Sequence, residues 1–291
     1  MNTYSWLVRR EFWENRAIWI VPIVIGAALT LAALFGRVDF AALSSPAQNR
    51  VLGGTALFAF GVTFFVVMSI YSSWYLLDCL YADRKDRSVL FWKSMPISDT
   101  ATVLAKLFTG LIAIPLVYFI AADVSTLLIA FIISVRARST FGNALWQPDI
   151  WLQLQALWLY LIVTSAIWYL PFAGWLLVVS AFAKRAVMLW SILPPSALYL
   201  LERWFFGTHV VGTALADRAL GYIHRAFHDM SDHTAWVKTV IDNDTITTPG
   251  SVWSLLNPLG FLSSPATWIG VIVGIAFIAG AIQFRLRRTE M

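Results

Sequence analysis

The sequence is poor in charged residues and nearly free of cysteine. Only 13% of its 291 residues are Asp, Glu, Lys or Arg, whereas 59% are hydrophobic, and the mean hydropathy is +0.71. Soluble domains average about 25% charged and about 45–50% apolar residues, so this composition indicates an integral membrane protein. The single cysteine, Cys79, excludes an intrachain disulfide, and its place at the end of an apolar run predicts a buried thiol.

Several motifs that carry chemistry are also missing. The sequence has no Gly-x-x-x-x-Gly-Lys-Ser/Thr loop to cradle phosphates, so we expect no ATP hydrolysis by this chain alone and do not expect an enzyme. It has no Cys/His zinc spacing, no His-Glu-x-x-His, no Gly-x-Ser-x-Gly and no histidine within an apolar run, which argues against an intramembrane protease. No small-residue cleavage site follows the first apolar run, so a cleavable signal peptide is not expected.

Long apolar runs are what the sequence does have. A membrane-spanning helix needs about 20 mostly apolar residues. The runs predict an all-α membrane protein with one domain, residues 1–291, built as a six-helix transmembrane bundle. The predicted spans are residues 17–35, 55–80, 103–133, 154–182, 186–206 and 266–284.

The basic residues predict the orientation. Most Lys and Arg residues that flank the spans lie on the side of the N-terminus, apart from those on the long connection at 207–264. Because cytoplasmic flanks carry the excess of Lys and Arg, both termini are expected in the cytoplasm. The net charge of +5 is thereby explained without nucleic acid, and lipid is the expected surrounding partner.

Segments outside the spans also carry patterns. Residues 1–16 predict an N-terminal interfacial helix, with Leu7 and Phe12 on its apolar stripe. The outer connection 207–264 predicts short amphipathic helices, one of them at 213–230 with Leu220 and Ile223 on its apolar face.

The inner loop 81–97 is the sharpest local feature. A mixed-charge stretch is followed by apolar side chains before Pro96, and a loop that was merely solvated would not need those apolar residues. We therefore predict that the loop docks a cytoplasmic partner. The docking residues are Asp83, Arg84, Lys85, Asp86, Arg87, Leu90, Phe91, Trp92 and Met95.

These features together resemble the permease subunit of a type-2 ABC transporter. The resemblance rests on Arg9-Arg10-Glu11 before the first span, on the loop running from Asp83 into Lys93-Ser94-Met95-Pro96-Ile97-Ser98, and on the six-span layout. It implies an exporter in a bacterial inner membrane, with loop 81–97 as the coupling helix. It also implies two copies of an ABC ATPase, which bind the ATP and Mg²⁺, and a second permease chain as homodimer or heterodimer. A path lined by apolar and aromatic side chains would suit a lipid, a hydrophobic drug or a peptide.

An alternative remains a non-transporting scaffold or sensor that docks the same ATPase. Asp123 within the third span, and Pro194 and Pro195 within the fifth, are candidates for the translocation path or gate. Asp78 and Lys106, at the inner ends of neighbouring spans, are expected to pair. No metal site is expected, and the weak candidates are His224 and His228, four residues apart on a predicted helix.

Overall fold

The protein is a bundle of helices in the computed structural model, which describes residues 3–36, 46–85, 98–137, 145–228 and 252–287. The first half holds α1 (Thr3–Glu14), α2 (Ala17–Phe35), α3 (Pro46–Lys85), α5 (Asp99–Phe108), a π-helical turn η1 (Thr109–Ala113) and α6 (Ile114–Ala137). The second half holds α8 (Pro148–Trp168), α9 (Leu170–Phe182), α10 (Val187–Phe205), α11 (Val210–Leu220), α12 (Tyr222–Ala226), α14 (Val252–Leu255), α15 (Pro258–Ser263) and α16 (Pro265–Arg287). The all-helical prediction is confirmed for the described residues, which contain no strand beyond an isolated bridge between Phe227 and Leu256.

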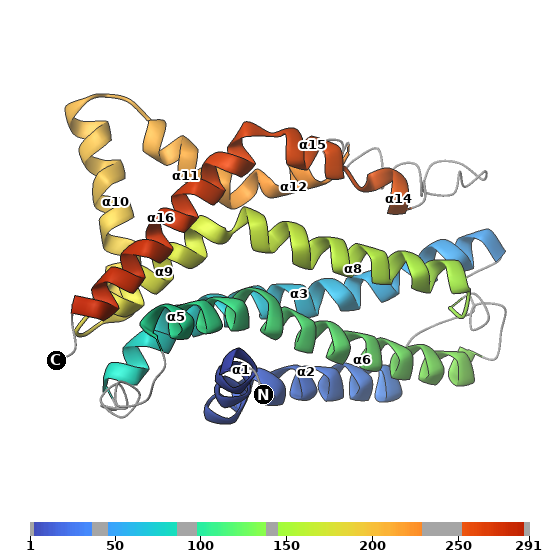
Figure 1. Cartoon of the computed structure of the whole chain (residues 1–291). Helices are drawn as coiled ribbons and strands as arrows, with labels where there is room; N and C mark the ends of the chain where they lie inside the picture. The colour runs from blue at the N-terminus through green and yellow to red at the C-terminus, as the bar shows by residue number, and fades with distance from the viewer. Residues whose placement is uncertain (1–2, 37–45, 86–97, 138–144, 229–251, 288–291) are drawn as a thin grey trace.

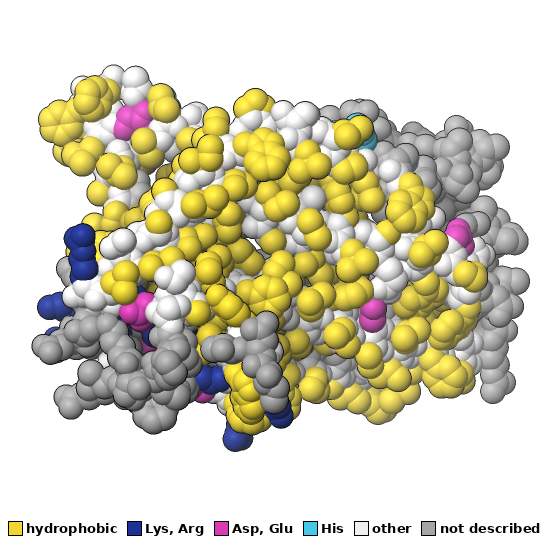
Figure 2. All heavy atoms as spheres, in the orientation of Figure 1, with side chains coloured by type: hydrophobic (Ala, Val, Ile, Leu, Met, Phe, Trp, Pro, Cys, Tyr) yellow, Lys and Arg dark blue, Asp and Glu magenta, His cyan; other side chains and the backbone are white. Residues whose placement is uncertain are grey.

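Within the described residues, five helices are long and apolar enough to cross a membrane. They are Ala17–Phe35, Ala56–Lys85, Asp99–Arg136, Pro148–Trp168 and Pro265–Arg287. The protein is therefore a multi-pass membrane protein. Apolar side chains cover most of the face drawn in Figure 2, and Lys and Arg gather at one end of it.

The remaining predicted spans differ from the structure in instructive ways. The predicted span 154–182 is two helices, because the chain leaves helical geometry at Tyr169, just before Pro171, whose missing N–H suits the first turn of α9. The predicted span 186–206 corresponds to α10, which is helical but not among the five, since Glu202 and Arg203 near its end lower its hydropathy. The predicted span at 186–206 therefore stays a prediction.

Local signals set several helix boundaries. The Ser98 hydroxyl accepts a hydrogen bond from the Ala101 N–H at 3.1 Å and so caps the start of α5. Asn257 caps α15 through the Gly260 N–H at 2.9 Å. Pro148 and Pro265 begin α8 and α16, where a missing N–H costs nothing.

The core of the bundle joins α2, α3, α6, α8, α9 and α16. Phe64, Tyr118, Trp158, Leu177 and Ile278 are among its buried side chains. Figure 1 shows α2 and α6 side by side, and α16 along α9, the pairs that also have the closest backbone contact. None of the residues of α10 is buried, so this helix stands apart from the core.

The outer connection is helical at α11 and α12. The predicted helix 213–230 is divided there, because the chain turns at Gly221 and one helical period does not run through both helices. Leu220 and Ile223, on its predicted apolar face, are not covered by the rest of the protein, whereas Tyr222 and Ala226 are buried against Trp168 and Phe261. The packing of Tyr222 against an aromatic cluster then decides which side faces inward.

Candidate functional site: a charge cluster at one end of the bundle

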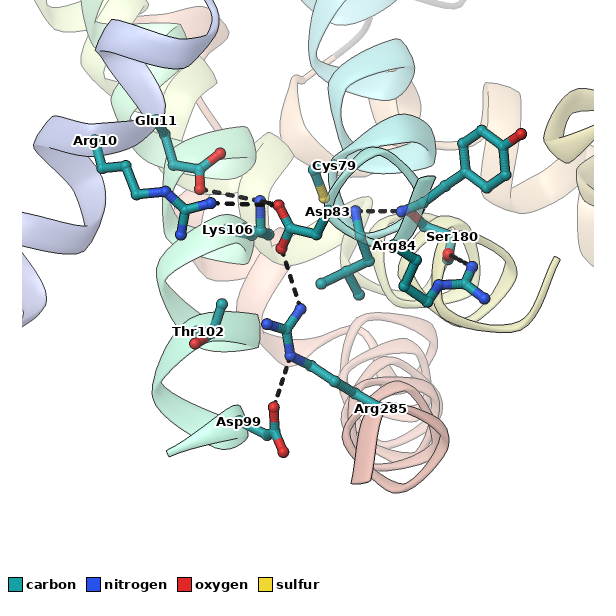
Figure 3. Close-up of polar contacts among 12 residues, drawn as sticks. Arg10, Glu11, Cys79, Asp83, Arg84, Asp99, Thr102, Lys106, Ser180 and Arg285 are labelled. Carbon is teal, nitrogen blue, oxygen red and sulfur yellow. Dashed lines mark hydrogen bonds and ion pairs between the residues drawn. The ribbon is translucent and has the colours of Figure 1, made fainter. Parts of the chain in front are cut away.

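Charged side chains from α1, α3, α5 and α16 meet at the end of the bundle where α3 ends and α5 begins (Figure 3). We call this the charge cluster, and its members are Arg10, Glu11, Asp83, Asp99, Lys106 and Arg285. Cations and carboxylates are equal in number, so the cluster is neutral as a whole. The equal number of cations and carboxylates makes burial among apolar helices possible, because an unpaired buried charge is strongly destabilising.

Lys106 lies at the centre of the cluster. Its ammonium is 3.0 Å from Glu11 Oε1 and 3.2 Å from Asp83 Oδ1, and the side chain is only 2% exposed. The other oxygen of Glu11, Oε2, accepts a hydrogen bond from the Tyr75 hydroxyl at 2.7 Å. One lysine on α5 thus holds α1 and α3 together at a point that water hardly reaches.

Asp83 joins the rest of the cluster to α16. Arg285 Nη1 lies 3.2 Å from Asp83 Oδ2, and Arg285 Nε lies 2.8 Å from Asp99 Oδ1. Arg10 Nη2 reaches Asp83 Oδ1 at 3.4 Å. Asp83 therefore faces cations from α1, α5 and α16 at once.

Arg10 forms the outer edge of the cluster. Its Nε contacts Glu14 Oε1 at 2.7 Å, one helical turn along α1. Burial by itself lowers the pKa of Arg10, but the hydrogen bond to Glu14 and the charges of Asp83 and Glu11 outweigh it and raise that pKa above its ordinary value. The guanidinium consequently stays charged at every physiological pH.

The sequence brings these groups together through simple helical spacing. Leu7 of α1 packs on Ala101 and Ala105 of α5, and Glu11 follows Leu7 by one turn on the same face. Lys106 directly follows Ala105, so the apolar contact between α1 and α5 aligns their charges. The small side chains of α5 allow this close approach.

A neighbouring contact ties the same end of α3 to α9. Arg84 Nη2 donates to the carbonyl oxygens of Ser180, at 2.5 Å, and Ala183, at 2.8 Å. The Ser180 hydroxyl in turn accepts from the backbone N–H groups of Leu80, at 3.0 Å, and Tyr81, at 3.1 Å. The end of α3 is therefore fixed on two sides.

The predicted docking residues fall into different settings. Asp83 is buried inside the charge cluster, Arg84 is half-buried with backbone acceptors, and Lys85 is exposed. The other docking residues lie outside the described residues: Asp86, Arg87, Leu90, Phe91, Trp92 and Met95. Sequence reasoning did not single out Asp99 or Arg285, and it used Arg10 and Glu11 only for the family resemblance, although each is a charge beside an apolar run.

The expected pairing of Asp78 with Lys106 is wrong. Lys106 turns instead to Glu11 and Asp83, while Asp78 lies on an exposed face of α3. Asp78 and Asp83 are five residues apart, which places them on different sides of a helix with 3.6 residues per turn. Only the side that carries Asp83 faces α5.

Asp123, a candidate for the translocation path, has a partner on α8. Its Oδ1 accepts a hydrogen bond from Gln155 Nε2 at 2.9 Å, and the side chain is half-buried. Thr164, a polar residue further along α8, bonds instead to the Tyr222 hydroxyl at 2.7 Å. Pro194 and Pro195 lie within α10, which stays helical from Val187 to Phe205. Their role in a path or gate stays a prediction.

The histidine pair does not have the spacing expected of ligands on one helix. His224 belongs to α12, but this helix ends at Ala226, and Phe227 is already extended, so His228 is not on the same helical face. Among the described residues, no group of three or more His, Cys, Asp or Glu side chains could hold a metal ion.

The charge cluster connects the ends of four helices through ion pairs. Every charged group in it lies against at least one group of opposite charge. What the arrangement does is fix the ends of α1, α3, α5 and α16 relative to one another. No family model, no curated protein and no solved structure matches the chain.

Proposed function

We propose that this chain is the membrane-spanning subunit of an ATP-driven exporter, and that a separate ATPase docks at the end of the bundle that holds the charge cluster. The proposal combines the sequence resemblance to type-2 ABC permeases with one structural observation that carries it. The helix ends flanking the predicted coupling loop are held by buried ion pairs that also reach α1 and α16.

Rigid flanks are what a docking loop needs in order to transmit force. If the ends of α3 and α5 could move freely, a displacement of the segment between them would not be transmitted to the other membrane helices. Because Asp83 and Asp99 are both bound to Arg285, a displacement at this end moves several membrane helices. The chemical energy would come from ATP and Mg²⁺ bound by the ATPase.

In this proposal, two permease chains and two ATPases form the transporter in a bacterial inner membrane. Both termini face the cytoplasm, which places α1 and the charge cluster on the ATPase side. The substrate would be a lipid, a hydrophobic drug or a peptide, moved past apolar side chains of the spans.

The test is purification of the tagged chain from native membranes in mild detergent, followed by mass spectrometry. We expect an ATPase with a phosphate-binding loop in stoichiometric amount. A variant that combines Lys85→Glu with Arg87→Glu should lose it, while a variant with Arg203→Glu, an exposed arginine in the last turn of α10, should keep it. Arg84 is unsuitable for this test because it bonds to the backbone of α9.

The absence of any ATPase from the parent preparation would contradict the proposal. Retention of the ATPase by the double variant would move the docking site away from loop 81–97. ATP-dependent movement of a fluorescent lipid or drug in vesicles then separates an exporter from a scaffold that docks the same ATPase without transport.

A further inference from the structure

Arg285 occupies a special place in the charge cluster. It lies in the last turn of α16, its side chain is 6% exposed, and its guanidinium contacts Asp83 and Asp99 at the same time. Asp83 is near the end of α3, and Asp99 is at the start of α5. One side chain of the C-terminal helix therefore joins the two helix ends between which the inner loop runs (Figure 3).

The chemistry of arginine suits this bridge. The guanidinium presents N–H groups in a fixed plane, so Nη1 can serve one carboxylate at 3.2 Å while Nε serves another at 2.8 Å. A lysine carries the same charge but a single ammonium, without the planar fork. The bridge therefore depends on the shape of the side chain as well as on its charge.

The remainder of α16 is held independently of this bridge. Gly274 of α16 lies against Leu170 and Pro171, and Gly174 of α9 lies against the backbone of Gly274. These close contacts place α16 along α9, as in Figure 1. Loss of the Arg285 bridge should consequently leave α16 in the bundle but free its end from α3 and α5.

We propose that Arg285 is a positioning residue that makes the end of α16 follow the ends of α3 and α5. Displacement of those ends by a docked ATPase is thereby passed directly to the C-terminal span. The mechanical link itself concerns only contacts within this chain. Its use in transport rests on the proposed function.

The link can be measured without any partner. Cys79 is first replaced by serine, and spin labels are attached through Lys85→Cys at the end of α3 and Gln283→Cys near the end of α16, both exposed positions. The distance distribution between the labels, measured in nanodiscs, should be narrow in this parent. Arg285→Gln should broaden it at least twofold, and Arg285→Lys should broaden it less.

Arg287→Gln is the matched control, because Arg287 is an exposed arginine two residues further along the same helix. It should leave the distribution unchanged. Thermal unfolding of each variant shows whether the bundle remains folded. A folded Arg285→Gln variant with the parent's narrow distribution would overturn the proposal.

The step that rests on the proposed function needs the complex with the ATPase. Trapping the complex with ATP and vanadate should change the spectrum of a label at Thr100→Cys, an exposed position at the start of α5 outside the predicted docking loop, and of a label at position 283 in the parent. In Arg285→Gln, only the label at position 100 should respond, and the amount of copurified ATPase should be unchanged.

A full response at position 283 in Arg285→Gln would overturn the coupling role of Arg285. A parent chain that binds no ATPase would instead contradict the proposed function. In that case the distance measurement on the isolated chain still decides whether Arg285 links the three helices.

Discussion

The charge cluster and the aromatic region around Trp168 hold helices together by opposite means. In the charge cluster, buried ion pairs join α1, α3, α5 and α16. In the aromatic region, Trp168, Tyr222 and Phe261 pack α8 against α12 and α15, and the hydroxyls of Tyr160 and Tyr222 make hydrogen bonds to neutral groups. Two arginines there, Arg218 and Arg225, place their guanidinium groups over the Trp168 ring, at 4.1 Å and 5.0 Å from its centroid.

The two kinds of contact predict different losses of stability when a side chain is substituted. Removing one partner of a buried ion pair leaves an uncompensated charge, which costs about 3–5 kcal/mol. Losing one neutral hydrogen bond costs only about 0.5–1.5 kcal/mol. Loss of one charged side chain from the charge cluster should therefore destabilise the protein strongly. Loss of one hydrogen bond from the aromatic region should lower its stability only slightly.

The largest effect is expected at Lys106. Lys106→Met leaves Glu11 and Asp83 without their shared cation, so we expect a loss of about 3–5 kcal/mol in the free energy of unfolding. Thermal unfolding in detergent, followed by tryptophan fluorescence, measures it. Lys184→Met, at an exposed position, is the control and should leave the melting temperature unchanged. Equal melting temperatures for the two variants would show that the cluster does not hold the bundle.

An intermediate effect is expected where α16 crosses α9, between the two regions. A Cβ added at Gly274 would lie 2.8 Å from Leu170 Cγ and 2.9 Å from the Leu170 backbone carbon, so Gly274→Ala should cost about 1–3 kcal/mol. The Cβ of Gly280→Ala would meet its nearest neighbour, Val178 Cγ2, at 3.6 Å, an ordinary contact. That control should be neutral or slightly stabilising, because alanine favours a helix over glycine. The opposite order of melting temperatures would contradict the packing of α16 on α9.

The smallest effect is expected at Tyr222. Tyr222→Phe removes its hydrogen bond with Thr164, but the Thr164 hydroxyl still donates to the Tyr160 carbonyl oxygen at 2.7 Å. We expect a loss of about 0.5–1.5 kcal/mol by thermal unfolding, and no change for Tyr4→Phe on the exposed face of α1. If Tyr222→Phe lowered the free energy of unfolding as much as Lys106→Met, the two regions would not differ in the way proposed.

The sequence predicted the spans well where apolar runs were long and uninterrupted. α2 begins and ends as expected, and α3, α5–α6 and α16 contain their predicted spans. It failed where a short-range feature competes with the apolar pattern, as at Tyr169, which divides one predicted span, and at Gly221, which reorients the predicted outer helix. Local sequence patterns do not say which of two competing features prevails.

The charge cluster could be predicted only in part. Lys106 and Asp83 were recognisable as charges beside apolar runs, but their partners on α1 and α16 come from the two ends of the sequence. Pairing between such distant residues depends on how the helices pack, and periodicity within one helix carries no information about it. For the same reason the hydrogen bond between Asp123 and Gln155 of α8 could not be predicted from the sequence.

The most direct test of the account is photo-crosslinking of the native complex from two exposed positions, Lys85 beside the charge cluster and Leu259 on α15. A photoreactive amino acid is placed at each position in turn, and the products are identified by mass spectrometry. The account predicts a cross-link to an ATPase subunit from position 85 and none from position 259. A cross-link to the ATPase from position 259, or none from position 85, would contradict docking at the charge cluster.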